Sequence, residues 1–189
     1  MGIWDALTGR AKPVRANLDA LFSLPSAAVT LQTAAGFIPT GVGSVCYRAA
    51  EGAAFAQTQR DVVALLDNDD DPDVETSTDA FGFTWLVARQ APEDLPALVT
   101  DLHTVNTSLE AQGFGSSLLC SLVGFEDASG RRLGLVYLYK QGTFYPFAPQ
   151  GPQQRDNLLE IQLRDMLAND LPVEQQLSRW MPLWGAPGL

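Results

Sequence analysis

Histidine and cysteine are both scarce in this chain of 189 residues, which has one histidine, His103, and two cysteines, Cys46 and Cys120. Two cysteines without C-x-x-C spacing are too few for a disulfide framework, and they make a poor zinc set because zinc ligands usually come in closely spaced pairs. Both lie in apolar, strand-like stretches, where a free cysteine behaves as a small buried hydrophobic residue. This usage indicates a reducing compartment, so the expected location is the cytoplasm.

Long hydrophobic runs are also missing. No stretch approaches the roughly 20 apolar residues that a membrane-spanning helix needs. The first residues have no long apolar core followed by a small-residue cleavage site, so we do not expect a signal peptide.

Basic residues are few, with 12 Lys and Arg against 22 Asp and Glu, and the imbalance is local. Residues 51–110 carry thirteen acidic side chains but only two basic ones, whereas residues 1–50 are slightly basic. Nucleic-acid binding needs clustered cations, so the acidic middle of the chain argues against it. The charge fits either a soluble surface or contact with a basic partner.

The composition that remains is that of a globular protein, with 46% hydrophobic and 18% charged residues. We predict one α+β domain over residues 1–189, in which an N-terminal helical segment (1–24) and a C-terminal tail (170–189) pack on the body. The strands expected next to each other in sequence indicate an antiparallel sheet of about five strands, with helices on one face.

The periodicity of apolar residues and the turn signals predict the individual elements. Helices are expected over residues 1–10, from Pro13 onward, from Pro25 to Ala35, and over Ala53–Leu66, 92–112 and Arg155–Ala168. Strands are expected over Ser44–Ala49, Phe81–Arg89, Leu118–Phe125, Arg132–Lys140 and Thr143–Phe147. Asp67–Asp79 is expected to be a solvated acidic loop. The leucine and valine positions expected in the core from the three long helices are Val62, Leu65, Leu66, Leu95, Leu98, Leu102, Val105, Leu109, Leu158, Leu159, Leu163 and Leu167.

Three sequence features invite a chemical interpretation, and each lacks a required residue. Asp67, Asp69 and Asp71 have the alternate spacing of a calcium loop, but the sixth and twelfth positions are Pro72 and Thr78 instead of glycine and glutamate. The glycine-rich stretch GFIPTGVGS (36–44) has no phosphate-binding lysine, and we interpret it as a flexible connection into a strand. A Cys–His pair needs an orienting third group, so His103 is expected to make a structural hydrogen bond.

The two termini carry the residues that are candidates for contact with a partner or a membrane. Ile3, Trp4 and Leu7 share a helical face near Arg10, Lys12 and Arg15, which is typical of a short interfacial anchor, although packing on the domain is an open alternative. Trp180 and Trp184 could anchor a partner or clasp the core, and we favour the core.

Several stretches resemble the PspAB family, the PspA-associated accessory proteins of the phage shock system. They are MGIWDALTGR at residues 1–10, AAGFIPTGVGSVCYRAAEGAAFA at 34–56, LVTDLHTVN at 98–106 with GFGSSLLCSL at 113–122, and the stretches YLYKQGTFYPFAPQ (137–150) and DLPVEQQLSRWMPLWGAPGL (170–189). The resemblance runs from end to end. It implies a cytoplasmic role beside PspA, a coiled-coil effector of envelope stress, and it assigns no catalytic residue.

The order of elements over residues 95–168 is also similar to that of type III secretion chaperones and YbjN-like proteins, which are binding modules. Our leading hypothesis is therefore a non-enzymatic adaptor that binds PspA or a related coiled coil, with no cofactor or metal. One alternative is a hydrolase or transferase that uses Cys120 with His103. Another is a peripheral lipid-binding protein that contacts the inner membrane weakly through Ile3, Trp4 and Leu7.

Overall fold

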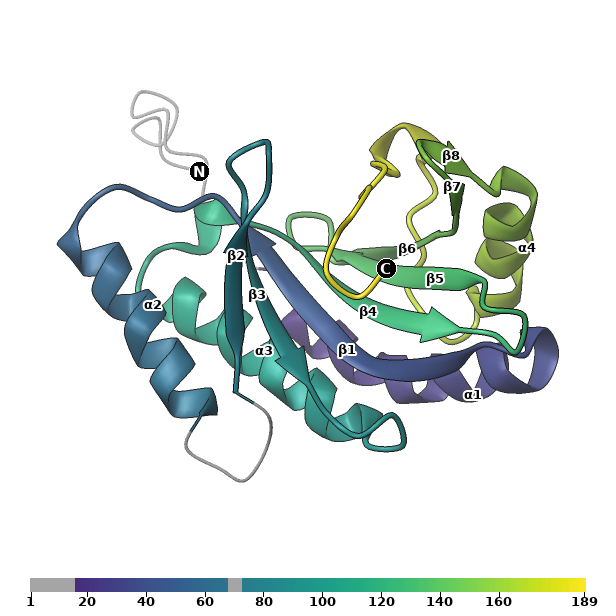
Figure 1. The fold of residues 1–189 in the computed structure, drawn as a ribbon, viewed down its shortest axis with the longest axis horizontal. Coiled ribbons are helices and arrows are strands. Elements are labelled where there is room, and N and C mark those ends of the chain that lie inside the picture. Colours follow the sequence, from purple (N-terminus) through teal and green to yellow (C-terminus); the bar gives the residue numbers. More distant parts are fainter. Residues whose placement is uncertain (1–15, 68–72) are drawn as a thin grey trace, which may run out of the picture.

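The computed structural model describes residues 16–67 and 73–189, and an antiparallel sheet of six strands lies at its centre (Figure 1). The strand order is β2-β3-β1-β4-β5-β6, and every pairing is antiparallel. The strands are β1 (Ile38–Tyr47), β2 (Glu75–Thr78), β3 (Thr84–Arg89), β4 (Leu118–Glu126), β5 (Arg132–Leu138) and β6 (Thr143–Phe147). A separate pair is formed by β7 (Pro149–Gly151) and β8 (Gln154–Arg155).

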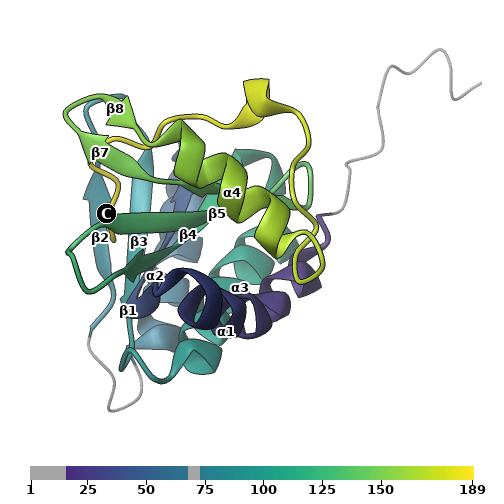
Figure 2. The ribbon, with the colours of Figure 1, turned by 90° about the vertical axis from the view of Figure 1, so that its right-hand side faces the viewer.

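The helices lie on one face of the sheet, and the tail (residues 170–189) crosses to the other face (Figures 1 and 2). They are η1 (Leu18–Ser23), α1 (Leu24–Ala35), α2 (Ala53–Leu66), α3 (Leu95–Ala111) and α4 (Asn157–Leu167). Two short 3-10 turns are η2 (Gly115–Ser117), which follows α3, and η3 (Leu177–Arg179), which lies within the tail. The predicted α+β class with helices on one face is thus confirmed. The buried side chains of helices, sheet and tail form one connected cluster.

Helix α3 forms as its sequence predicts. The Asp94 side chain accepts a hydrogen bond from the Ala97 amide, 3.1 Å, and so caps the first turn. The helix is followed by Gly113, whose φ of 86° suits glycine after a helix end. Its expected apolar stripe faces the sheet, and the five residues are all buried: Leu95, Leu98, Leu102, Val105 and Leu109.

The glycine-rich stretch before Ser44 is part of strand β1, so the predicted flexible connection is wrong. A Cβ at Gly43 would lie 3.0 Å from Leu102 and 3.2 Å from Leu98, which means that α3 packs directly on the strand backbone. A Cβ at Gly41 would overlap the carbonyl oxygen of Gln90, and Gly41 also has a φ of 77°. These glycines allow close approach of backbones, a packing role that a loop interpretation does not anticipate.

The predicted acidic loop contains strand β2, which was not expected. All four of its residues are exposed and polar or charged, because it pairs on one side only, with β3, at the edge of the sheet. An edge strand of this kind shows no apolar alternation from which it could be predicted. The turn into β3 is ordered by Asp79, which accepts hydrogen bonds from the Phe81 and Phe83 amides and from the Trp85 indole, 2.9–3.0 Å.

The side chain of Asp79 is held ionised by these contacts. Burial opposes ionisation of the carboxylate, but the hydrogen bonds from Trp85, Phe83, Phe81 and Gly82 outweigh it and lower the pKa of Asp79 below its usual 3.8. Phe81, at the tip of the turn, is 83% exposed, so strand β3 starts at Thr84 and not at Phe81 as predicted.

The tail covers the face of the sheet opposite the helices. It first runs beside β6, where Val173 bridges to Phe144, and it then turns over the sheet. Trp180 stacks on Tyr145 with a centroid distance of 5.7 Å, and the Trp184 ring meets the edge of Phe147 at 5.0 Å. Its last residues, Gly188 and Leu189, lie over Gly124 and Gly134, which are paired across β4 and β5 and leave room for them.

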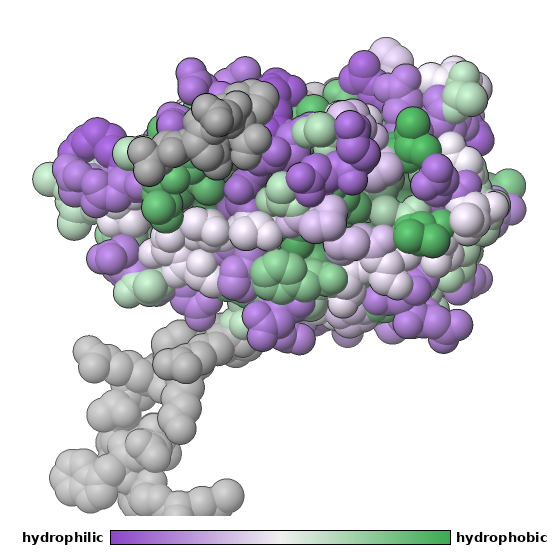
Figure 3. Space-filling view, turned by 90° about the horizontal axis from the view of Figure 1, so that it is seen from below, coloured by the Kyte–Doolittle hydropathy of each residue, from purple (hydrophilic) through white to green (hydrophobic). Residues whose placement is uncertain are grey.

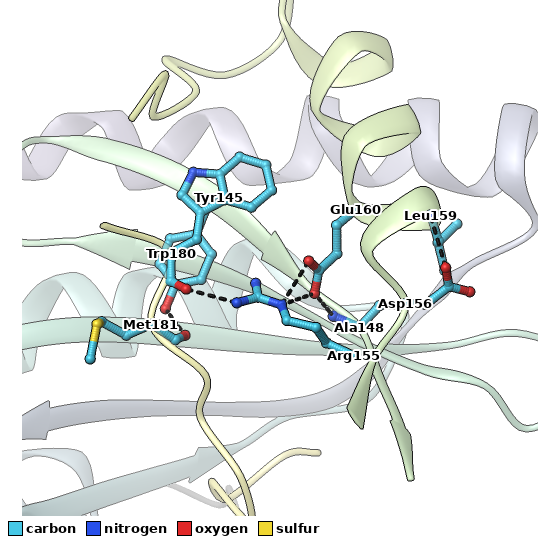
Figure 4. Close-up of polar contacts among 8 residues, drawn as sticks. All are labelled: Tyr145, Ala148, Arg155, Asp156, Leu159, Glu160, Trp180 and Met181. Atoms are coloured by element: carbon cyan, nitrogen blue, oxygen red, sulfur yellow. Dashed lines mark hydrogen bonds and ion pairs between the residues drawn. The ribbon is translucent and has the colours of Figure 1, made fainter. Parts of the chain in front are cut away.

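A buried ion pair fixes the tail to β8 and α4 (Figure 4). Arg155 Nε donates to both carboxylate oxygens of Glu160, 2.8 and 3.0 Å, and its Nη1 donates to the carbonyl oxygen of Trp180, 2.8 Å. The Ala148 amide also donates to Glu160, 2.8 Å, and the Tyr145 hydroxyl donates to the carbonyl oxygen of Met181, 2.8 Å. Desolvation of the carboxylate exceeds the effect of these donors, so the pKa of Glu160 is raised above 4.5.

Two predicted core positions are wrong. Leu65 on α2 is 58% exposed and Leu158 on α4 is 70% exposed, because each helix touches the body with a narrower stripe than its apolar content suggests. In α4, Leu163, Leu167 and the ion-paired Glu160 are the buried positions. In the described ranges 16–67 and 73–189, no helix combines the length and the hydropathy that crossing a membrane requires.

Candidate partner-binding groove

A groove of about 460 Å³ lies between α2 and the end of α3. One wall is a single face of α2 with spacings of three and four residues: Ala54, Gln57, Thr58, Asp61, Val62 and Leu65. The other wall is the last turn of α3 and the residues after it: Ser108, Ala111, Gln112 and Phe114. We call this feature the α2–α3 groove.

Helix α2 is held to the body by a narrow stripe of residues along one side. Its buried residues are Phe55, Thr58 and Val62. The Phe55 ring is 4.9 Å from Phe114, edge to face, and 5.8 Å from Tyr47 on strand β1. Several residues on the two walls are small, such as Ala54, Ser108 and Ala111, and small side chains leave space between the helices unfilled.

The polar groups of the groove are acidic or neutral. Asp61 is the one charged residue among those that line it, and it accepts a hydrogen bond of 2.6 Å from Gln57. Arg60 lies outside the lining and donates to Gln57, 2.6 Å. The lining is therefore mixed: five of its ten residues are apolar and five are polar, and Asp61 supplies its one charge.

Figure 3 shows that hydrophobic residues on the underside of the molecule form separate patches among hydrophilic ones. Large apolar residues that are exposed elsewhere, such as Phe22, Val29, Ile38 and Leu158, come from different elements. Isolated exposed apolar residues are normal for a protein surface. The α2–α3 groove differs from them because it is hollowed and has two facing walls.

A second hollow of about 490 Å³ lies beside the tail, where Leu183 and Trp184 approach Leu159 and the β7–β8 turn. The tail itself forms one wall of this hollow. The α2–α3 groove, in contrast, is formed by two helices of the body, and we take it as the candidate site.

The alternative hypothesis of a Cys120–His103 pair requires the two side chains to be close together, and they are not. Cys46 alternates along β1 with residues such as Gly43 that face α3, so its side chain and that of its partner Cys120 lie on the tail face of the sheet. His103 is on α3, on the opposite face, where its ring is 4.8 Å from Phe22 and its Nε2 is 3.5 Å from Asp19. The sheet separates the thiol from the imidazole.

The structure also locates the remaining candidate residues. Trp180 is 5% exposed, and Trp184 is half-buried against Phe147, so the tail presents neither indole as a free anchor. Ile3, Trp4 and Leu7 lie outside the described residues, and the lipid-anchor hypothesis stays a prediction. Within the described ranges, no three His, Cys, Asp or Glu side chains are grouped as metal ligands; Asp69 and Asp71 are outside them.

Sequence reasoning did not find the α2–α3 groove, although one signal was available. Four of the six positions of α2 that line the groove are alanine, glutamine, threonine and aspartate, where a fully packed helix would carry large apolar residues. Small and polar residues on the inward side of a helix indicate an unfilled contact.

The comparisons with known proteins agree with the resemblance of the sequence. The family model described as PspAB, PspA associated protein B, matches residues 1–188, which is essentially the whole chain. No curated protein and no solved structure matches this chain, so the likeness to type III secretion chaperones and YbjN-like proteins gains no support.

Proposed function

Because this chain belongs to the PspA associated protein B family, we propose that it is an accessory protein that binds PspA, or a PspA-like coiled-coil protein, through the α2–α3 groove. The family name supports the partner, and the groove is the observation that carries the mode of binding. The proposed setting is the cytoplasmic side of an envelope stress response, and the proposed action is binding without catalysis.

The shape of the groove suits one helix of a coiled coil. Its α2 wall extends from Ala54 to Leu65, which corresponds to about 16 Å at 1.5 Å per residue. An amphipathic helix that lies along such a groove presents apolar residues at spacings of three, four and seven. Three turns of a partner helix would place two or three such residues against Val62, Leu65 and Phe114.

The charge of the groove favours a basic residue on that helix. Asp61 lies in the lining, and the sequence around α2 is acidic, with nine acidic residues and one basic residue over positions 51–79. A lysine or arginine beside the apolar stripe of the partner would pair with Asp61. Complementary charge of this kind raises the association rate and fixes the orientation of the two helices.

Calorimetry with purified PspA tests the proposal, using Leu65→Asp as the variant and Leu158→Asp as its matched control. Both leucines are exposed on helices, so neither change removes a buried side chain. We expect Leu65→Asp to weaken binding by about tenfold or more, about 1.4 kcal/mol, and Leu158→Asp to have no effect. Equal affinities of the two variants would exclude the groove, and absence of any complex with PspA would exclude the partner.

A further inference from the structure

The two cysteines occupy directly opposite positions on neighbouring strands. Cys46 on β1 is the register partner of Cys120 on β4, and both are free thiols. Side chains that face each other across an antiparallel pair have Cβ atoms about 4.5–5.5 Å apart and point to the same side of the sheet. A disulfide needs a Cβ separation of about 3.5–4.5 Å, so a small local adjustment is enough to join the sulfurs.

The surroundings of the pair protect it from large reagents. Cys46 is 3% exposed and Cys120 is 7% exposed. On the same face, Ser44 donates a hydrogen bond to the carbonyl oxygen of Pro187, 3.2 Å, and Leu122 contacts Gly188. Ser44 and Leu122 are the next residues after the cysteines on this face of β1 and β4. The tail therefore ends beside the cysteines. Each thiol therefore has the other as its nearest reactive group.

Ionisation of the Cys120 thiol is also disfavoured. The hydrogen bond with Cys46 and the burial of the sulfur raise the pKa of the Cys120 thiol. Because the thiolate is the form that reacts, this environment makes the reaction slow until the face opens. The pair is thus stable as a dithiol in a reducing compartment.

We propose that Cys46 and Cys120 form a reversible dithiol–disulfide site that a small two-electron oxidant, such as hydrogen peroxide, closes within one chain. One thiolate attacks an oxygen of the peroxide: an S–O bond forms to give a sulfenic acid, the O–O bond breaks, and the departing hydroxide takes up the proton that the thiol had released, which gives water. The second sulfur then attacks the sulfenic sulfur, forms the S–S bond and displaces a second water. In total, two thiols and one peroxide give one disulfide and two waters.

Closure of this bond has a defined structural consequence. It links the two central strands of the sheet and encloses residues 47–119, which include α2, α3 and strands β2 and β3. A link across a loop of this length restricts the unfolded chain more than the folded one. The oxidised protein should therefore unfold at a higher temperature than the reduced protein. This inference does not depend on the proposed function of the groove.

Treatment of the purified chain with hydrogen peroxide tests the site. We expect both thiols to disappear from titration in denaturant, the intact mass to fall by two hydrogens, and peptide mapping to link Cys46 with Cys120 in a monomer. Dithiothreitol should restore both thiols and the lower unfolding temperature. Cys46→Ser and Cys120→Ser, which cannot form the bond, should show neither the mass loss nor the thermal shift.

Three results would overturn the proposal, and all are read on the wild-type chain, so they do not require the variants to fold. They are retention of both thiols, disulfides between chains only, or sulfinic acid on either cysteine without a bridge.

Discussion

Glycine has two roles in this chain: it adopts a positive φ, and it allows close packing of backbones. Gly36 and Gly41 distinguish these roles. Gly36 and Gly41 have nearly the same φ, 74° and 77°, a conformation that residues with a Cβ adopt at a cost of about 1 kcal/mol or more. A Cβ at Gly36 would have nothing within 4 Å, whereas one at Gly41 would overlap the carbonyl oxygen of Gln90. Only the second glycine is needed for close packing.

Gly41→Ala should therefore destabilise the protein more than Gly36→Ala does. We expect Gly36→Ala to lower the free energy of unfolding by about 1 kcal/mol, from its φ alone. Gly41→Ala adds a backbone overlap that no side-chain rotation relieves, and we expect a loss of about 3 kcal/mol or more. Urea unfolding followed by circular dichroism measures both, and equal losses would show that β1 and Gln90 separate easily.

The sequence predicts residue roles well where local chemistry decides them. Helix α3 and its five buried residues follow from helix-start signals and periodicity, although the helix begins at Leu95 and not at residue 92. The packing role of Gly41 depends on Gln90, nearly fifty residues away in the sequence. A single sequence contains no information on such a long-range approach.

At the scale of elements, the ion pair between Arg155 and Glu160 determines where α4 and the tail meet. The side chain of Glu160 is 2% exposed, and that of Arg155 is 20% exposed. Arg155 also contacts the tail through Trp180 and lies 5.2 Å from the centre of the Phe147 ring. Removal of one partner from such a pair leaves an uncompensated buried charge.

Arg155→Met is expected to lower the free energy of unfolding by about 3 kcal/mol near neutral pH. The pKa of Glu160 is already raised in the folded protein, and loss of the guanidinium raises it further. A raised carboxyl pKa penalises folding as pH rises above the ordinary value of 4.5, and the penalty vanishes below it. The deficit of the variant should thus be larger at neutral pH than below about pH 4.

Urea unfolding of wild type and Arg155→Met over this pH range measures the deficit. A deficit that does not change with pH would mean that the carboxylate is solvated after the substitution. A deficit that grows on acidification would contradict the assignment of Glu160 as the group responsible.

The longer elements were predictable because each has its own pattern, and the meander β4-β5-β6 follows from short turns between apolar strands. The short strands β2, β7 and β8 were not predictable, since they are polar and form only by pairing with a neighbour. The α2–α3 groove was not predictable for a related reason: it depends on how two helices pack together, which the apolar pattern of neither helix specifies.

At the scale of the whole molecule, the tail covers the sheet face on which the cysteines lie. Gly124 is central to this cover, since a Cβ there would overlap the carbonyl oxygen of Gly188 and lie 2.8 Å from the Thr40 hydroxyl. The φ of Gly124 is not in the positive range, so an alanine at this position has no backbone strain. Its methyl group would clash only with Gly188 and Thr40.

Gly124→Ala should displace the last residues of the tail and expose the tail face. We expect native Cys46 and Cys120 to react with an aromatic disulfide reagent at least tenfold faster than in wild type, because reaction requires an open state that the tail otherwise closes. Gly151→Ala is the matched control, since its Cβ would have nothing within 4 Å. An unchanged rate in Gly124→Ala would show that the tail does not limit access to the thiols.

The stacked aromatic rings of the tail have one further consequence. Trp180 on Tyr145 and Trp184 on Phe147 hold two indoles in fixed, asymmetric surroundings, while the backbone that they cover belongs to other elements. Detachment of the tail would therefore reduce the near-ultraviolet dichroism of these rings and leave the far-ultraviolet signal of the sheet and helices intact. The molecule thus contains its own optical reporter, which distinguishes tail release from unfolding of the domain without any added label.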